Sequence, residues 1–190
     1  MDIIFVRHGR TSINQQGRYG GVLDTDISDA GIAEIKRLTG RLKGTAFDGV
    51  YTSPLRRAIR TVDLLAGNYR IDERLKEMNF GIFEGLTYEE ICERYPEESR
   101  KWARDFVHYR LPDGESVHDV YERTKAFVRA VKDKHDNVLA VTHGGVIRCA
   151  LSLVFDNIEF FYKFKIDHGS ITVVSIEKDF MYIKSMNGVY

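Results

Sequence analysis

Short apolar runs rich in β-branched residues alternate along the chain with segments of helical periodicity. Each run predicts a strand, and a near-continuous run such as NVLAVT is typical of a sheet covered on both faces. The predicted strands are residues 3–6, 47–52, 69–71, 137–142, 171–177 and 180–186. A tight turn at Lys178 and Asp179 is expected to join the last two.

Between these runs, apolar residues recur every three or four positions, which predicts amphipathic helices. Ser28 is the expected N-cap of the first helix. Ser53 and Pro54 predict the cap and the first residue of the second helix. Residues 117–131 carry the strongest periodic signal, and residues 144–154 are expected to form the last helix.

Strands alternating with helices predict an α/β fold with a doubly wound, mostly parallel sheet, one antiparallel strand and helices on both faces. Residues 75–116 break this alternation, because they hold two expected helices (86–95 and 98–106) and no convincing strand. We interpret this stretch as a helical insertion over the C-terminal strand ends, since it is too small for a core of its own. Residues 1–190 are therefore expected to form a single domain.

The composition is that of an ordinary globular protein. The 28 basic and 28 acidic residues cancel, so no overall field directs the chain to nucleic acid or to an anionic membrane. No apolar stretch resembles a signal peptide or a membrane span. The two cysteines, Cys92 and Cys149, have no metal-ligand spacing. We expect a cytoplasmic protein with reduced thiols that binds neither nucleic acid nor membrane.

Histidines and arginines gather where predicted strands end. Arg7 and His8 follow the first strand, His143 and Gly144 follow the strand at 137–142, and Arg57 lies shortly after the second strand. Since parallel strands end at one edge of a sheet, these residues are expected to converge. Guanidinium groups and helix-start amides suit a phosphoryl group, and a neutral imidazole is a competent nucleophile.

Each of these residues also has a non-catalytic interpretation. A lone histidine at a strand end is more often structural than catalytic. The arginines Arg56, Arg57 and Arg60 taken alone fit a solvated helix face. A metal site is a further alternative for the two histidines, although no carboxylate or cysteine accompanies them at ligand spacing.

The stretch VRHGRT, followed after two intervening residues by Asn14, resembles the histidine phosphatase superfamily, as do SPLRRAIRT and VTHGG further on. That group includes the cofactor-dependent phosphoglycerate mutases. The resemblance implies a phosphoglycerate mutase-like fold and hydrolysis of phosphomonoesters, with no metal and no cofactor, through a phosphohistidine on His8. The phosphoryl-binding residues that it implies are Arg7, Asn14, Arg57, His143 and the amide of Gly144.

The proton donor of that family lies on a Glu-x-x-x-Gly-x-x-x-Gly segment, which EMNFGIFEG matches. The resemblance therefore implies Glu77 as the catalytic acid, while Glu84 in the same stretch is set aside. The non-catalytic interpretation of Glu77 is a surface ion pair with Arg74 or Lys76. Arg10 stands where the family often has Glu or Gln, and its charge either favours a second anionic group on the substrate or is simply solvated.

The insertion resembles the α-ribazole phosphatase branch in EMNFGIFEGLTYEEICERYPEESRKW and in YRLPDGES. This implies a small phosphorylated substrate, α-ribazole 5′-phosphate of cobalamin biosynthesis. The insertion's aromatic residues either stack on a flat base or pack the insertion onto the sheet. They are Phe80, Phe83, Trp102, Phe106 and Tyr109. The alternatives are a broad-specificity acid-type phosphatase, a phosphoglycerate mutase and a non-catalytic module that binds phosphorylated ligands.

Overall fold

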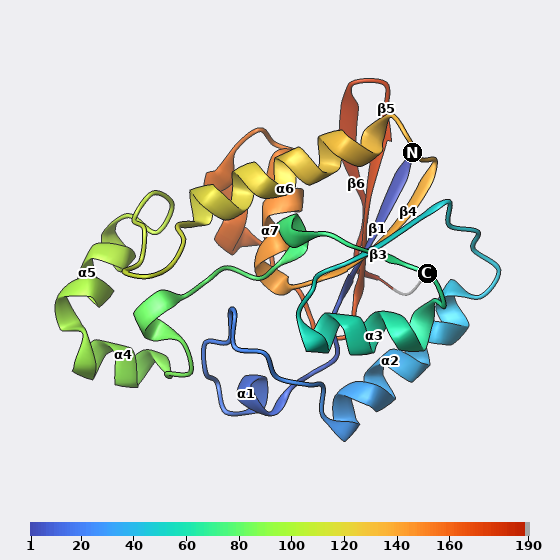
Figure 1. Ribbon diagram of the computed structural model, residues 1–190. Coiled ribbons are helices and arrows are strands. Elements are labelled where there is room, and N and C mark those ends of the chain that lie inside the picture. The colour runs from blue at the N-terminus through green and yellow to red at the C-terminus, as the bar shows by residue number, and fades with distance from the viewer. Residues whose placement is uncertain (189–190) are drawn as a thin grey trace.

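The computed structural model describes residues 1–188, which contain one mixed sheet (Figure 1). Its strands are β1 (Asp2–Arg7), β2 (Gly49–Thr52), β3 (Arg70–Ile71), β4 (Asn137–Thr142), β5 (Ile171–Glu177) and β6 (Phe180–Gly188). They lie in the order β3-β2-β4-β1-β5-β6. The first four strands of that order are parallel, and β5 runs antiparallel to both of its neighbours. The predicted α/β fold class, with its single antiparallel strand, is confirmed.

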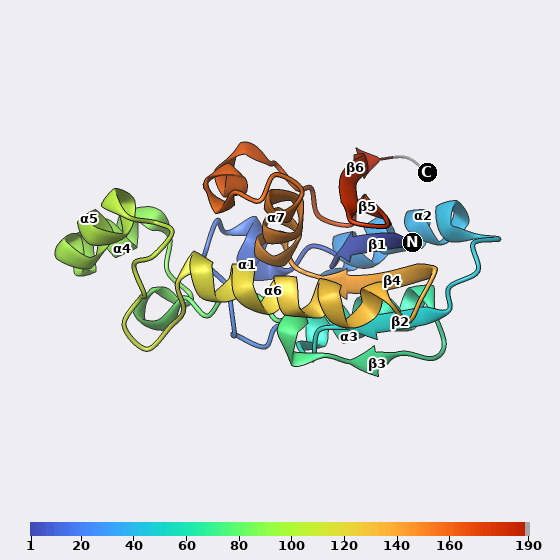
Figure 2. The same ribbon diagram turned by 90° about the horizontal axis from the view of Figure 1, so that it is seen from above.

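Helices cover both faces of the sheet. The α-helices are α1 (Ser12–Gln15), α2 (Asp29–Leu42), α3 (Arg56–Leu65), α4 (Tyr88–Arg94), α5 (Pro96–Arg104), α6 (Val117–Lys132) and α7 (Gly144–Leu153). Three 3₁₀ helices are η1 (Glu73–Leu75), η2 (Gly81–Phe83) and η3 (Ile158–Lys163). Helices α2 and α3 pack together on one face and α6 and α7 on the other (Figure 1). Helices α4 and α5 lie beyond the carboxyl ends of the parallel strands (Figure 2).

The side-chain alternation of the central strand β1 divides the core into two layers. Ile3 and Phe5 belong to the apolar cluster on the α6 and α7 side, and Ile4 and Val6 to the cluster on the α2 and α3 side. All four are at most 3% exposed. Burying a side chain of this size contributes about 1.5–3 kcal/mol, so β1 anchors both layers and gives the residues that follow it a rigid support.

Helix starts agree with the sequence at Ser28, and α4 and α5 each start within two residues of the predicted 86–95 and 98–106, at Tyr88 and Pro96. Ser28 caps α2 by accepting a hydrogen bond from the amide of Gly31 at 3.2 Å. The prediction that Ser53 caps α3 is wrong, because α3 begins at Arg56 after an N-cap residue without a side-chain hydrogen bond. The Ser53 hydroxyl accepts from the amide of Leu55 at 3.3 Å, ahead of the helix, and also lies 2.8 Å from Nε2 of His143. A buried imidazole needs such a partner, and the helix starts two residues later than expected.

Residues 75–116 share their apolar cluster with the sheet. Leu75, Phe83 and Trp102 are buried in the same cluster as Ile3 and Phe5 of β1. Phe80, Phe106 and Tyr109 are partly buried against that cluster. Most of the insertion's aromatic residues therefore pack the insertion onto the core. None of the helices of residues 1–188 combines the length and the hydropathy that crossing a membrane would require.

Candidate active site

The structure brings His8 and His143 together at the ends of neighbouring strands. In the parallel pairing of β1 and β4, Arg7 lies opposite Thr142, so the two histidines that follow are adjacent. The amide of His8 donates to the carbonyl of Thr142 at 3.0 Å. Their imidazole ring centroids are 5.0 Å apart. The convergence expected from the strand order is therefore present in the fold.

His8 is held as a neutral imidazole with one nitrogen unblocked. Its Nδ1 lies 2.8 Å from the carbonyl of Gly9, which can only accept, so Nδ1 carries the proton and Nε2 keeps its lone pair. Burial, and then the charges of Arg57 and Arg7, hold the pKa of His8 well below its usual value. Position 9 needs a glycine, since a Cβ there would lie 2.8 Å from the carbonyl oxygen of Gly31.

His143 is also neutral and is hydrogen-bonded at both nitrogens. Nε of Arg57 donates to Nδ1 of His143 at 3.3 Å, so Nε2 carries the proton and donates to the Ser53 hydroxyl at 2.8 Å. Burial, and then the charge of Arg57, lower the pKa of His143 well below its usual value. The imidazole is fully buried, and this chain of hydrogen bonds fixes its orientation.

Arg57 joins the site to the loop at residues 20–23. Its NH1 donates to the carbonyl of Leu23 at 2.8 Å, and its NH2 donates to the carbonyls of Gly21 at 2.6 Å and Gly20 at 3.2 Å. Most donors of this predicted phosphate ligand are thus engaged within the protein. A phosphoryl group must either exchange with these carbonyls or use the remaining proton on NH1.

Arg7 has a donor that the protein leaves unpaired. Its NH1 donates to the carbonyl of Ile166, while Nε is buried without a hydrogen-bond partner among the described residues. The guanidinium lies against Gly144, where a Cβ would come within 3.2 Å of Cζ. Burial lowers the pKa of Arg7 to about 10, so the group stays protonated near neutral pH. A buried cationic donor without an acceptor is costly, which favours binding of an anion.

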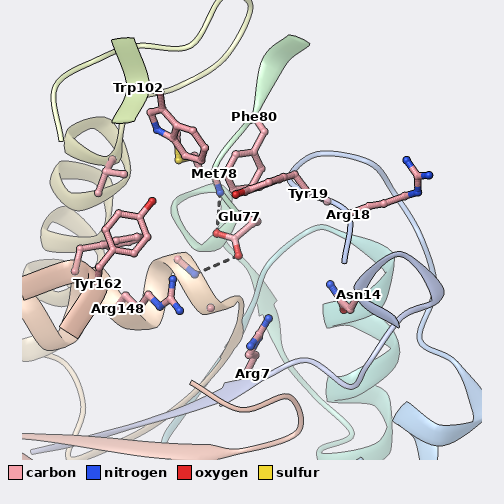
Figure 3. A pocket seen from close by; sticks show the side chains of 15 residues that line it. Arg7, Asn14, Arg18, Tyr19, Glu77, Met78, Phe80, Trp102, Arg148 and Tyr162 are labelled. Carbon is pink, nitrogen blue, oxygen red and sulfur yellow. Dashed lines mark hydrogen bonds between the residues drawn. The ribbon is translucent and has the colours of Figure 1, made fainter. Parts of the chain in front are cut away.

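Asn14 and Gly144 complete the predicted phosphoryl ligands and line the same pocket as Arg7. Oδ1 of Asn14 accepts hydrogen bonds from the amide of Thr11 at 3.2 Å and from its hydroxyl at 3.0 Å. The side-chain nitrogen Nδ2 of Asn14, which can only donate, therefore faces the pocket (Figure 3). Gly144 opens α7, so its amide lies at the positive end of a helix dipole.

Glu77 projects into the same pocket from the loop after η1 (Figure 3). Oε1 accepts from the amide of Met78 at 2.9 Å and Oε2 from the amide of Gly145 at 3.2 Å. The surface ion pair considered for Glu77 is not formed. Arg74 pairs instead with Asp72, and Lys76 pairs with Glu73.

Glu84 has a structural environment. Its two carboxylate oxygens accept from the backbone amides of Gly21, Val22, Leu23 and Phe80 at 2.9–3.3 Å. The loop at residues 20–23 is therefore held by two charged side chains. Its carbonyls accept from the guanidinium of Arg57, and its amides donate to the carboxylate of Glu84. Glu84 therefore fixes the loop that in turn positions Arg57.

The pocket that Arg7, Asn14 and Glu77 line has a volume of about 250 Å³ and an aromatic wall, and His8, Arg57 and His143 are not among its lining residues (Figure 3). Tyr19 lies edge-on to Phe80 and to Trp102, with ring centroids 5.0 and 5.7 Å away. Phe161 and Tyr162 of η3 line the pocket as well. The site thus combines a cationic floor, a carboxylate and an apolar wall, an arrangement that can hold a phosphoryl group and the organic group attached to it.

Three residues at the site were not predicted in these roles: Ser53, Arg148 and His168. Arg148 lies one turn after Gly144 on α7, a spacing that could have identified it. His168 lies in the loop before β5, and its ring centroid is 5.9 Å from that of His8. Burial lowers the pKa of His168 to about 3. Nothing in the sequence pattern places this third histidine beside the first, since no regular element contains it.

The charge of Arg10 is paired within the protein. Arg10 forms an ion pair with Glu34 at 3.3 Å, and its side chain is 47% exposed. It is therefore a partly solvated surface group. Within residues 1–188, no group of three or more His, Cys, Asp or Glu side chains is arranged to hold a metal ion. Cys92 and Cys149 form no disulfide within residues 1–188.

Comparison with known proteins gives a consistent result. The model of the histidine phosphatase superfamily (branch 1) matches residues 3–188. Phosphoserine phosphatase 1 of Hydrogenobacter thermophilus is 34% identical over 93% of this chain and 87% of its own. A putative alpha-ribazole-5′-P phosphatase from Escherichia coli superposes with a TM-score of 0.93 at 27% identity, over 99% of this chain and 96% of that one. A phosphoserine phosphatase mutant from Entamoeba histolytica, in complex with phosphoserine, superposes with a TM-score of 0.85 at 25% sequence identity. The superposition covers 99% of this chain and 97% of that one.

Proposed function

The chain belongs to the histidine phosphatase superfamily (branch 1) and is a phosphatase of that superfamily, and from this we propose that it hydrolyses small phosphomonoesters, without a metal ion, through a phosphohistidine on His8. The observation that carries the proposal is the state of His8. Its Nδ1–H is bound to the Gly9 carbonyl, its Nε2 lone pair is unblocked, and its depressed pKa keeps it neutral near neutral pH. A neutral, oriented imidazole is the form that can attack phosphorus.

In the first step, Nε2 of His8 forms a bond to phosphorus as the bond from phosphorus to the ester oxygen breaks. The Glu77 carboxyl group, protonated when the substrate binds, transfers its proton to that departing oxygen. Arg7, Asn14 and the Gly144 amide stabilise the charge on the three equatorial oxygens. Arg57 adds its positive charge, and His143, its ring still held by Arg57, adds a donor once a phosphoryl oxygen replaces the Ser53 hydroxyl as the acceptor of its Nε2–H.

In the second step, the Glu77 carboxylate takes a proton from a water molecule as the water oxygen attacks phosphorus. The bond between phosphorus and Nε2 breaks, phosphate leaves, and His8 returns to its neutral form with Nδ1 still protonated. Glu77 is protonated again, so the cycle closes without a redox change or a second substrate. Its hydrogen bonds to Met78 and Gly145 keep the carboxylate at one place for both steps.

Two substrates are supported by different observations. α-Ribazole 5′-phosphate is supported by the aromatic wall of the pocket, which includes Phe80 and Trp102, and by the Escherichia coli structure. Phosphoserine is supported by the Hydrogenobacter thermophilus relative and by the pocket's small volume. The enzyme would act on either substrate in the cytoplasm, and the first reaction would belong to cobalamin biosynthesis.

A panel of phosphomonoesters tests the proposal, with both candidate substrates and 4-nitrophenyl phosphate included. Wild-type protein should release phosphate from at least one of them, and His8→Ala should reduce the rate by several orders of magnitude. His118→Ala is the matched control, because His118 is exposed on α6. Undiminished turnover by His8→Ala would remove His8 as the nucleophile.

A further inference from the structure

Arg148 is a pocket residue to which the proposed mechanism gives no role. It lies on α7 one turn after Gly144, and its side chain lines the pocket beside Glu77 (Figure 3). Gly145, whose amide binds the Glu77 carboxylate, is three positions earlier on the same helix face. Because Glu77 delivers its proton to the leaving oxygen, Arg148 lies on the leaving-group side of the site.

The guanidinium of Arg148 has no hydrogen bond or ion pair to another residue among residues 1–188, and its buried Nε is unpartnered. Arg7 shares the unpartnered Nε but donates from NH1 to the carbonyl of Ile166, and the other two arginines are engaged more fully. Arg18 forms a bidentate pair with Glu90 at 2.6 and 3.0 Å, and Arg57 is bound to loop carbonyls. A partly buried cation with all its donors unused pays a desolvation cost that an anionic ligand would recover.

Two aromatic rings orient this guanidinium. Its Cζ lies 5.5 Å from the centroid of Phe161 and 5.8 Å from that of Tyr162. Such contacts stabilise a planar cation over a ring face and leave its N–H edge available for hydrogen bonds. The planar edge matches the two oxygens of a carboxylate. Arg10, the other residue considered for a second anion, is already paired with Glu34.

We propose that Arg148 binds a carboxylate on the leaving group, so that the preferred substrates are small phosphomonoesters of hydroxy acids or hydroxyamino acids, such as phosphoserine. This rests on the proposed function and names its substrate class. The pocket volume of about 250 Å³, just under the usual 300–1,000 Å³ of small-molecule sites, agrees with a compact substrate. A carboxylate at Arg148 would also hold the ester oxygen close to the Glu77 carboxyl group.

The test compares phosphoserine with phosphoethanolamine, which is the same molecule without the carboxylate. Arg148→Met should lower the ratio of kcat/KM for phosphoserine to that for phosphoethanolamine by about 10- to 100-fold, the loss of a charge-assisted hydrogen bond or pair of bonds. Arg148→Lys keeps the charge without the planar edge and should give an intermediate ratio. Arg129→Met, an exposed arginine at the far end of α6, is the control and should keep the wild-type ratio.

The proposal is overturned if Arg148→Met leaves the ratio of the two kcat/KM values unchanged. If both values fall equally, Arg148 binds the phosphoryl group instead. If neither falls, Arg148 does not contact either substrate. Calorimetric binding of the two compounds to His8→Ala separates this question from catalysis. A preference for phosphoserine there that Arg148→Met abolishes would support carboxylate recognition even if no phosphate were released. Equal binding of both compounds to His8→Ala would contradict it.

Discussion

Replacing Gly145 by alanine should disable Glu77 while leaving the fold intact. A Cβ at position 145 would lie 2.3 Å from Oε1 of Glu77, whereas ordinary contacts begin at 3.4 Å. The atom in the way is the end of a flexible side chain, so the carboxylate withdraws by about 1 Å and the backbone stays in place. A misplacement of that size costs about 100-fold in rate.

The expected stability change of Gly145→Ala is small because two effects oppose each other. Alanine is favoured over glycine in a helix by up to about 1 kcal/mol. Weakening the hydrogen bond between the Gly145 amide and Oε2 costs about 1.5–3 kcal/mol. The free energy of unfolding should therefore fall by about 3 kcal/mol at most, as measured by urea titration.

Leaving-group dependence identifies the cause of the lost activity. Gly145→Ala should lower kcat/KM about 100-fold for an alkyl phosphate, whose leaving oxygen needs a proton, and far less for 4-nitrophenyl phosphate, whose leaving group is a stable anion. Glu77→Gln should show the same pattern. Gly40→Ala is the control, since a Cβ on that exposed residue of α2 meets nothing within 4 Å. Equal losses on both substrates would refute the assignment of Glu77 as the acid.

Three further predictions concern stability, pH and metals. Glu84→Gln should lower the free energy of unfolding by about 1–3 kcal/mol, because a carboxylate that accepts four backbone amides loses acceptor capacity; an unchanged urea midpoint would contradict this. The pKa values of His8, His143 and His168 are lowered in the folded protein, so below pH 6.5 the unfolded chain binds more protons than the folded one. The free energy of unfolding should therefore fall on acidification by about 1.4 kcal/mol per pH unit for each histidine. Urea titrations from pH 7 to pH 5 measure that slope, and a flat profile would contradict it. Dialysis against EDTA should leave the hydrolysis of 4-nitrophenyl phosphate unchanged, whereas a loss that added metal reverses would favour a metal site.

The meeting of the two histidines could be predicted because it follows from strand patterning. The apolar runs at 3–6 and 138–141 mark buried parallel strands, and each run ends at an arginine or threonine followed by histidine. Neighbouring parallel strands in register necessarily place such residues side by side, as the pairing of Arg7 with Thr142 does. Local pattern and sheet geometry were sufficient for this part of the site.

The remaining features depend on contacts between distant segments that no local pattern encodes. Ser53 has the sequence context of a helix cap, yet its hydroxyl binds His143, which lies 90 residues away. Arg57 looks like a free phosphate ligand, but the carbonyls of loop 20–23 occupy most of its donors. The aromatic support of Arg148 comes from η3, a 3₁₀ helix without amphipathic periodicity. These features required the structure.

The most direct test of the central claim is to trap the covalent intermediate. Glu77→Gln lacks the base that activates water, so it should react with 4-nitrophenyl phosphate and then accumulate the phosphorylated enzyme. Alkaline quenching followed by peptide mass spectrometry should place one acid-labile phosphoryl group on His8. Release of nitrophenol without any adduct, or an adduct on another residue such as His143 or His168, would contradict the account.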